Sequence, residues 1–433
     1  MGSWRGEGSH ESAGHVGDSG LVTGRHPRFF VAVGLVSVLC ACSPQVSQPP
    51  KQAGSAGSGA TVLWSDGASL GTLTTKNPRS TSVPDQPGLE ATNALLTEVA
   101  TEATARGLPA TALARSATLI RTTLNRTASK MAERATVRTE LLDGLKRLRA
   151  GLVVVKPSTG EIVAVAGTAD DGRLLASEPE PTGSVFKVFT LLAAARAGIP
   201  LTARFDARSP TTLRGGAVIS NFSADPSPTP VVTLETATSH SLNVVFARLA
   251  VDQLGLPTVI ATAHRAGIPS TVTLSPQDPF TSLGDTPMAA KDVANAYATV
   301  ASGGLHCPVH LIASSTAAGL APLAPCQRVF EPKVVAETTQ ALRSVVEVGT
   351  GRRAKLPGRI VVGKTGTAQG NLSAWFAGST GDLTAVAVVV GSKQRPLRNI
   401  AGLSEVTGSS LPTDLWRTFV NAYLNTPQPV GSP

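Results

Sequence analysis

The sequence has few aromatic residues and few cysteines, and it has neither an internal repeat nor a nucleic-acid-binding motif. Aromatic side chains make up 4% of the 433 residues, so a core must be built largely from Ala, Val and Leu, for which the 42% hydrophobic content suffices. Aromatics do not interleave with the basic residues, and we therefore expect no nucleic-acid partner. The length suits one large domain and a smaller one.

The apolar run near the N-terminus is short. It extends from Phe29 to Leu39 after the basic stretch Arg25-His-Pro-Arg28, an order typical of a secretory signal and too short to span a bilayer comfortably. The following Leu39-Cys40-Ala41-Cys42 resembles the lipobox of bacterial lipoproteins, which implies a lipid on Cys42. We expect an exported protein, lipid-anchored at the outer face of the cytoplasmic membrane. A plain signal peptide and an uncleaved anchor are the alternatives.

The net charge of +9 is distributed unevenly. Residues 101–150 hold ten Lys or Arg against four acidic residues. In one interpretation this basic segment is attracted to an anionic membrane or cell wall, and in the other it is an ordinary solvated face.

Four cysteines occur in the chain. If Cys40 is removed with the signal and Cys42 carries a lipid, Cys307 and Cys326 remain. Two thiols in an oxidising compartment predict a disulfide between them, with two buried free thiols as the alternative.

Hydrophobic periodicity indicates a large domain at residues 150–426. Strands are predicted at 151–156 and 161–167, helices at 184–197, 233–250, 288–302 and 333–347, and returning strands at 359–363, 374–377 and 383–390. Strands at both ends with helices between them predict an α+β fold, in which helices flank an antiparallel sheet.

A small N-terminal module is predicted at residues 61–149. It has a hairpin at 61–73, helical patterns at 89–118 and 128–148, and an alternating stretch at 120–124. The flanking segments are the signal at 1–42, a flexible tether at 43–60 that is rich in Ser, Gly, Pro and Gln, and a short tail at 427–433.

Three short motifs occur in order: Ser184-Val-Phe-Lys187, Ser241-Leu-Asn243 and Lys364-Thr-Gly-Thr367. The first opens a helical pattern, so its serine and lysine share one face and the lysine amine can reach the serine hydroxyl. Free N–H groups and the dipole at the helix start favour a developing oxyanion. The first two motifs are common by chance, whereas all three in this order are not.

The motifs predict serine acyl-transfer chemistry. A neutral Lys187 accepts the proton of Ser184, and burial together with a second cation, for which Lys364 is the candidate, disfavours the charge on Lys187. Ser241 relays the proton to the leaving group, and Asn243 fixes Lys187 and a substrate amide.

The Lys-Thr-Gly-Thr strand offers an edge to an extended peptide. Gly366 is expected to leave room for the peptide backbone. The hydroxyls of Thr365 and Thr367, with the charge of Lys364, suit a C-terminal carboxylate.

Residues from about 118 to 425 resemble the transpeptidase domain of penicillin-binding proteins. The resemblance is carried by three stretches: Thr182-Gly-Ser-Val-Phe-Lys-Val188, residues 236–249, and Val362-Gly-Lys-Thr-Gly-Thr-Ala-Gln369. It implies the fold shared by these proteins and serine β-lactamases. Cys307 and Cys326 fall where actinobacterial members carry a cysteine pair. No stretch is expected to hold the glycosyltransferase domain of bifunctional members, and Val185 replaces a residue that is commonly small or hydroxylated.

The resemblance also implies roles for the motif residues. Ser184 would be the acylated nucleophile and Lys187 its base, and the backbone N–H groups of Ser184 and Thr367 would form an oxyanion hole. The implied substrate is the D-Ala-D-Ala end of a peptidoglycan stem peptide, with β-lactams as its mimics. Neither a metal nor an organic cofactor is implied.

Two other functions remain open from the sequence. A D,D-carboxypeptidase or endopeptidase would carry the same motifs, because they do not distinguish water from an amine as acceptor. A non-catalytic β-lactam sensor or wall-binding module would keep the fold, although the intact motifs argue against it. His240, beside Ser241, is interpreted as a helix-surface residue, since no G-x-S-x-G elbow occurs.

Overall fold

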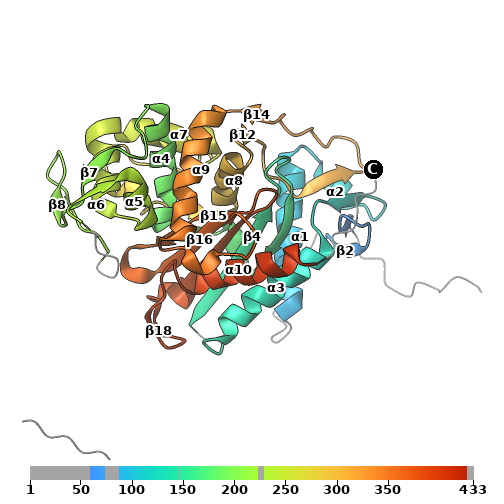
Figure 1. Cartoon of the computed structure of the whole chain (residues 1–433). Coiled ribbons are helices and arrows are strands. Elements are labelled where there is room, and N and C mark those ends of the chain that lie inside the picture. The colour runs from blue at the N-terminus through green and yellow to red at the C-terminus, as the bar shows by residue number, and fades with distance from the viewer. Residues whose placement is uncertain (1–58, 74–86, 146, 223–228, 427–433) are drawn as a thin grey trace, which may run out of the picture. The chain divides into compact units, whose positions relative to one another are not determined.

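The computed structural model describes residues 59–73, 87–145, 147–222 and 229–426 (Figure 1). The chain divides into two units, Met1–Gly54 and Ser55–Pro433, and all described residues belong to the second. The predicted signal, with Cys42, and the predicted tail lie outside the described residues, as does nearly all of the tether. Helices in the described part are α1 (Pro87–Ala105), α2 (Ala110–Leu113), α3 (Arg126–Leu141), α4 (Lys187–Arg196), α5 (Leu234–Ser239), α6 (Asn243–Arg248), α7 (Leu256–Ala266), α8 (Ala290–Ala301), α9 (Pro332–Glu347) and α10 (Leu411–Leu424).

A five-stranded antiparallel sheet forms the centre of the large domain. Its strands, in spatial order, are β15 (Val362–Thr367), β16 (Ser373–Ser379), β17 (Thr384–Gly391), β4 (Leu148–Val155) and β5 (Ile162–Ala166). The middle strand, β17, reads Thr-Ala-Val-Ala-Val-Val-Val-Gly and is buried along its whole length, as expected for a strand covered on both faces. The predicted α+β class is confirmed.

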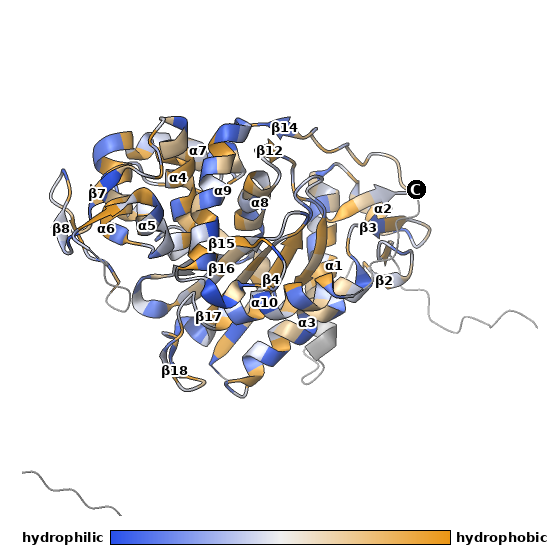
Figure 2. Cartoon of the chain, viewed as in Figure 1, coloured by the Kyte–Doolittle hydropathy of each residue, from blue (hydrophilic) through white to orange (hydrophobic). Residues whose placement is uncertain are grey.

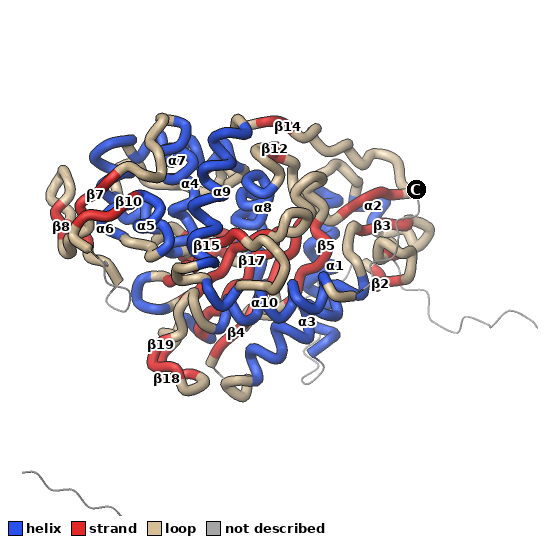
Figure 3. The backbone as a smooth tube through the Cα atoms, in the orientation of Figure 1, coloured by secondary structure: helices blue, strands red, loops and turns tan. Residues whose placement is uncertain are grey.

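Helices cover both faces of this sheet (Figure 3). On one face, Ala385, Ala387 and Val389 of β17 belong to the same hydrophobic cluster as Trp416 of α10. On the other face the intervening valines share a cluster with Tyr297 of α8. This alternation follows from the period of two in a strand. Figure 2 shows the resulting concentration of hydrophobic residues on the central strands.

Three N-terminal strands and one later strand form a second sheet of four strands. Its order is β13 (Ile312–Ser315), β3 (Leu119–Thr122), β1 (Thr61–Leu63) and β2 (Ser69–Thr72). The predicted hairpin at 61–73 is confirmed, because β1 and β2 pair antiparallel. The strand β13, which the sequence did not predict, comes from far along the chain, so the N-terminal module is completed by a segment that follows α8.

The predicted helical stretch at 89–118 is divided, because Gly107 adopts a φ of 88° after α1. The predicted helix at 128–148 ends at Leu141, and β4 begins at Leu148. Although α3 was predicted as part of the N-terminal module, it packs against β4, β5 and α10. The boundary at residue 150 stays a prediction.

Short elements complete the described chain. The two-stranded pairs are β7 (Arg204–Asp206) with β10 (Val231–Thr233), β6 (Pro179–Pro181) with β11 (Pro287–Ala289), β12 (Leu305–His306) with β14 (Gln327–Arg328), β18 (Arg398–Ile400) with β19 (Leu403–Glu405), and β8 (Thr211–Thr212) with β9 (Val218–Ile219). The short helical turns are η1 (Leu175–Ser177), η2 (Gly183–Phe186), η3 (Leu249–Leu254), η4 (Pro279–Leu283), η5 (Arg352–Ala354), η6 (Gln369–Asn371) and η7 (Ser392–Gln394).

Cys307 and Cys326 form a disulfide. The predicted pairing is confirmed. The bond closes the loop that carries β13, so it fixes the segment that completes the N-terminal sheet.

Across the described ranges, no single helix is both long and apolar enough to cross a membrane, although the bent pair Asn243–Leu254 and Leu256–Ala266 meets the length and composition test when taken together.

Candidate active site

The first motif lies on a tight turn between β6 and α4. Ser184 belongs to the 3-10 turn η2, and the α-helix begins at Lys187. Gly183 has a φ of 54°, a conformation that favours glycine. A Cβ on Gly183 would lie 2.4 Å from the carbonyl oxygen of Thr367. The glycine therefore allows the turn that carries Ser184 to lie directly against the end of β15.

The second motif lies at a break between two helices, where the sequence predicts one continuous helix. The first helix, α5, ends at Ser239, and α6 begins at Asn243. Between them Ser241 has a φ of 57°, an uncommon left-handed conformation for a residue with a side chain. Such a backbone outlier is typical of functional sites. Here the break directs Ser241 and Asn243 to the amine of Lys187.

Hydrogen bonds connect the three motifs through Ser241. Lys187 Nζ donates to the carbonyl oxygen of Ser241 at 2.7 Å, to its Oγ at 3.4 Å, and to Asn243 Oδ1 at 2.7 Å. Lys364 Nζ donates to the same Ser241 Oγ at 2.7 Å. Asn243 in turn donates through Nδ2 to the carbonyl oxygen of Ser220 at 3.0 Å, which fixes its amide orientation.

Both lysines are fully buried, with 0% of their surface exposed. Burial and the proximity of a second cation each disfavour a charged amine. The carbonyl oxygens that accept from Lys187 favour its charged form. Both lysine amines also contact the Ser241 hydroxyl. A hydroxyl between two amines is suited to proton transfer.

The third motif lies within β15, in agreement with the prediction that it forms a strand. Thr365 Oγ1 lies 2.7 Å from Thr350 Oγ1, and Thr367 Oγ1 accepts from the N–H of Gly408 at 3.0 Å. A Cβ on Gly366 would lie 2.3 Å from the carbonyl oxygen of Thr182. The close neighbour of this glycine is therefore the turn that carries Ser184, whereas the sequence predicted that the glycine makes room for a bound peptide.

A cleft with two arms extends from Ser184. The first arm has a volume of about 540 Å³, and residues of all three motifs line it together with His240, Val348, Thr350 and Arg352. The second arm, of about 380 Å³, is lined by Ser184, Asn221, Asp285, Gln369 and Arg398 among others. Thus His240, predicted to be a helix-surface residue, lies at the end of α5 on the wall of the cleft.

Two carboxyl groups belong to the described lining of these arms. Glu405 forms an ion pair with Arg398 at 3.4 Å. Burial, and next the nearby carboxyl of Asp278, raise the pKa of Asp285. Neither residue belongs to a motif, and neither was predicted from the sequence to be part of the site.

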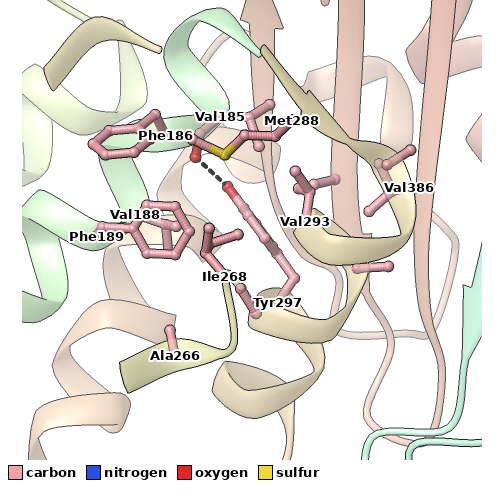
Figure 4. Packing of buried hydrophobic residues seen from close by; sticks show 14 of the residues in the cluster. Val185, Phe186, Val188, Phe189, Ala266, Ile268, Met288, Val293, Tyr297 and Val386 are labelled. Carbon is pink, nitrogen blue, oxygen red and sulfur yellow. Dashed lines mark hydrogen bonds between the residues drawn. The ribbon is translucent and has the colours of Figure 1, made fainter. Parts of the chain in front are cut away.

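Tyr297 contacts the turn that carries Ser184 (Figure 4). It projects from α8, and its hydroxyl donates to the carbonyl oxygen of Val185 at 2.9 Å. Burial raises the pKa of the Tyr297 phenol well above its usual value, so the group stays a donor at physiological pH. Tyr297 was not among the residues predicted from the sequence to belong to the site. The available signal was that the chain has only two tyrosines and that one lies in a predicted core helix.

A family model described as the penicillin binding protein transpeptidase domain matches residues 150–402. This match covers more than half of the chain, and the chain therefore belongs to that family.

Curated relatives agree with this assignment. The chain is 32% identical over 335 residues to penicillin-binding protein 1A of Mycobacterium tuberculosis, covering 71% of this chain and 40% of the relative. It is 28% identical over 338 residues to the peptidoglycan D,D-transpeptidase PbpA of the same species, covering 64% of this chain and 67% of the relative. The chain thus spans about two fifths of the length of the first relative.

Solved structures are similar as well. PonA1 from Mycobacterium tuberculosis, solved in complex with penicillin V, has a TM-score of 0.68 and 28% identity, covering 79% of this chain and 96% of that one. Penicillin-binding protein A of Mycobacterium tuberculosis, solved as an imipenem acyl-enzyme complex, has a TM-score of 0.63. At 22% identity, this second likeness concerns the fold alone.

Proposed function

We propose that the protein is a D,D-transpeptidase that cross-links peptidoglycan stem peptides through an acyl-enzyme on Ser184. The observation that carries the proposal is the convergence of Lys187 and Lys364 on the hydroxyl of Ser241, in a cleft that Ser184 also lines. A nucleophile, a buried base and a relay hydroxyl in one cleft are the elements of covalent acyl transfer.

In the proposed acylation, Ser184 Oγ attacks the carbonyl carbon of the penultimate D-Ala, and its proton passes to Lys187 Nζ. The backbone N–H groups of Ser184 and Thr367 stabilise the tetrahedral oxyanion. The C–N bond then breaks, and the leaving D-Ala nitrogen receives a proton from the Ser241 hydroxyl. A lysine ammonium that donates to Ser241 Oγ replaces this proton. The products are an ester on Ser184 and free D-Ala.

In the proposed deacylation, the amine of a second stem peptide attacks the ester carbonyl. The same groups work in reverse: the amine loses a proton through Ser241 to a lysine, and Ser184 Oγ regains one as the ester bond breaks. Attack by water in place of the amine would give the carboxypeptidase reaction. A protein whose acyl-enzyme is formed but not released would act as a sensor.

The decisive experiment combines an acyl-donor peptide ending in D-Ala-D-Ala with an amine acceptor and the purified protein. We expect release of D-Ala together with a peptide–acceptor product, and neither with the Ser184→Ala variant. Release of D-Ala without the coupled product would favour a carboxypeptidase. A β-lactam adduct on Ser184 without any D-Ala release would favour a sensor.

We further propose that the protein is exported and held at the outer face of the cytoplasmic membrane by a lipid on Cys42. The apolar run at 29–39 and the small residues after it support the proposal, and so does the Cys307–Cys326 disulfide, a bond that persists in oxidising compartments. One acyl chain anchors weakly and several anchor stably. The test is membrane fractionation of the Cys42→Ser variant, which we expect to leave the membrane fraction. An unchanged distribution and mobility would contradict lipidation.

A further inference from the structure

Thr350 lies outside the three motifs, yet its side chain reaches the third one. Its Oγ1 lies 2.7 Å from Thr365 Oγ1, and both residues line the first arm of the cleft. Thr350 belongs to the loop that follows α9, fifteen residues before Thr365 in the chain. The contact is therefore made by the fold and not by local sequence.

The loop that carries Thr350 is fixed to the helix of the second motif. The N–H of Thr350 donates to the carbonyl oxygen of Ser239 at 3.0 Å. A Cβ on Gly349 would lie 2.2 Å from that same carbonyl oxygen, so a side chain at this position would push the loop away. Ser239 is the last residue of α5, two residues before Ser241. Thr350 is thus bonded both to the end of α5, next to Ser241, and to β15.

The hydroxyls of this wall have hydrogens left to donate. In the pair of Thr350 and Thr365, one hydroxyl donates to the other, and the accepting one keeps its hydrogen for a further partner. Thr367 Oγ1 accepts from the N–H of Gly408, so its own hydrogen is likewise directed elsewhere. Arg352, an exposed cation on the same loop, lines the same arm. Hydroxyl donors beside a cation match a carboxylate.

We propose that Thr350 is a specificity-determining residue, which forms a carboxylate-binding wall with Thr365 and Thr367 and selects ligands that carry a free carboxylate. The proposal rests on the proposed acyl transfer at Ser184, because the carboxylate in question is the one next to the scissile amide or the lactam. It adds a residue from outside the motifs to the groups that recognise the substrate.

The test compares benzylpenicillin with its methyl ester on the wild type and on Thr350→Val, a variant of similar shape without the hydroxyl. The readout is the second-order rate constant of acylation, followed by intact-protein mass spectrometry. A hydrogen bond to a charged group is worth about 1.5–3 kcal/mol, so we expect the acid to react about 10- to 100-fold more slowly with the variant. The ester should change less than about threefold, since it carries no charge for the hydroxyl to stabilise.

Thr350→Ser, which keeps the hydroxyl, is the matched control, and it should retain the preference of the wild type for the acid. Equal losses for acid and ester would show that Thr350 only shapes the loop, and unchanged rates for both would show that it has no role. Either result overturns the proposal. If Thr350→Val does not fold, Thr350→Ala is compared in the same way. A wild-type protein without any adduct on Ser184 would instead refute the acyl-transfer function.

Discussion

Lys187 and Lys364 donate hydrogen bonds to one atom, Ser241 Oγ, at 3.4 and 2.7 Å. The two lysines come from α4 and β15, and the serine lies between α5 and α6, so four elements converge on one oxygen. Each lysine amine can therefore exchange a proton with the Ser241 hydroxyl. The geometry thus makes Ser241 the link between the base and the third motif.

The Ser241→Ala variant should show this link directly. We expect acylation by a β-lactam to slow by about 10²–10⁴-fold, the usual contribution of positioned proton transfer. Ser239→Ala is the matched control, because its hydroxyl bonds within α5 to the carbonyl oxygen of Thr236 and not to a lysine. The control should acylate within about threefold of the wild type. Equal rates in the two variants would contradict a relay through Ser241.

The Tyr297→Phe variant should separate positioning from binding. The substitution keeps the packed ring and removes the donor to the carbonyl oxygen of Val185, which adjoins Ser184. We expect the limiting acylation rate constant to fall about three- to tenfold, in line with one hydrogen bond. The dissociation constant of the initial non-covalent complex should not change.

Tyr423→Phe provides the matched control, since Tyr423 lies on α10 and stacks on Phe419, on the opposite face of the sheet from α8. It should leave both acylation constants unchanged. A weaker initial complex in Tyr297→Phe, with the limiting rate constant preserved, would contradict the positioning role.

Much of the site could be predicted because its residues fall in short, contiguous sequence motifs. Ser184 and Lys187 are one helical turn apart, and Lys364 to Thr367 form one strand, so residue types and spacing suffice. The break at Ser241, where φ is 57°, could not be predicted, because the surrounding residues fit a helix. The bond between Thr350 and Thr365 joins a loop to the strand that follows it, and β13 pairs with a strand far earlier in the chain. Hydrophobic periodicity reveals neither contact.

Removing the disulfide should destabilise the protein without affecting the active site. Cys307 and Cys326 close a loop with a sequence separation of 19, for which chain entropy predicts about 3 kcal/mol of stability. The loop carries β13, so the Cys307→Ser/Cys326→Ser variant should also show faster hydrogen exchange in β13 and β3. Neither cysteine lines the cleft, and acylation at 25 °C should be unchanged. An unchanged denaturation midpoint would contradict the prediction.

Asp292 should make stability depend on pH. Burial raises its pKa to about 6, against an opposing effect of Lys291 and a smaller reinforcing effect of Glu98. Below the unfolded pKa of about 4 the carboxyl is protonated in both the folded and the unfolded state, so it does not lower the free energy of unfolding. As pH rises through the folded value the buried charge appears, and the stability lost approaches about 1–3 kcal/mol.

The Asp292→Asn variant should therefore be more stable than the wild type at pH 7.5, and this difference should shrink steadily as the pH falls from about 6 toward 4, as measured by denaturant unfolding. Asp382→Asn, a change at an exposed turn between β16 and β17, is the control and should show no such difference. A constant gap between Asp292→Asn and the wild type across this range would refute the pKa argument.

The acyl-enzyme formed with a β-lactam should persist for minutes or longer. Fast hydrolysis needs a base that activates water, and class A β-lactamases use a glutamate for this. No glutamate occurs between Asn243 and Glu331, and of the two described carboxyl groups along the cleft, Glu405 is paired with Arg398. Asp285, whose pKa is raised by burial and by Asp278, belongs to none of the three motifs.

Without a placed base, water attacks the Ser184 ester about 10²–10⁴-fold more slowly than with one. A chromogenic cephalosporin should thus give one stoichiometric burst and then almost no turnover. We expect Asp285→Asn to leave the residual hydrolysis unchanged, since Asp285 lines the cleft outside the three motifs. Rapid multiple turnover by the wild type would contradict the prediction, and its loss in Asp285→Asn would identify that residue as the base after all.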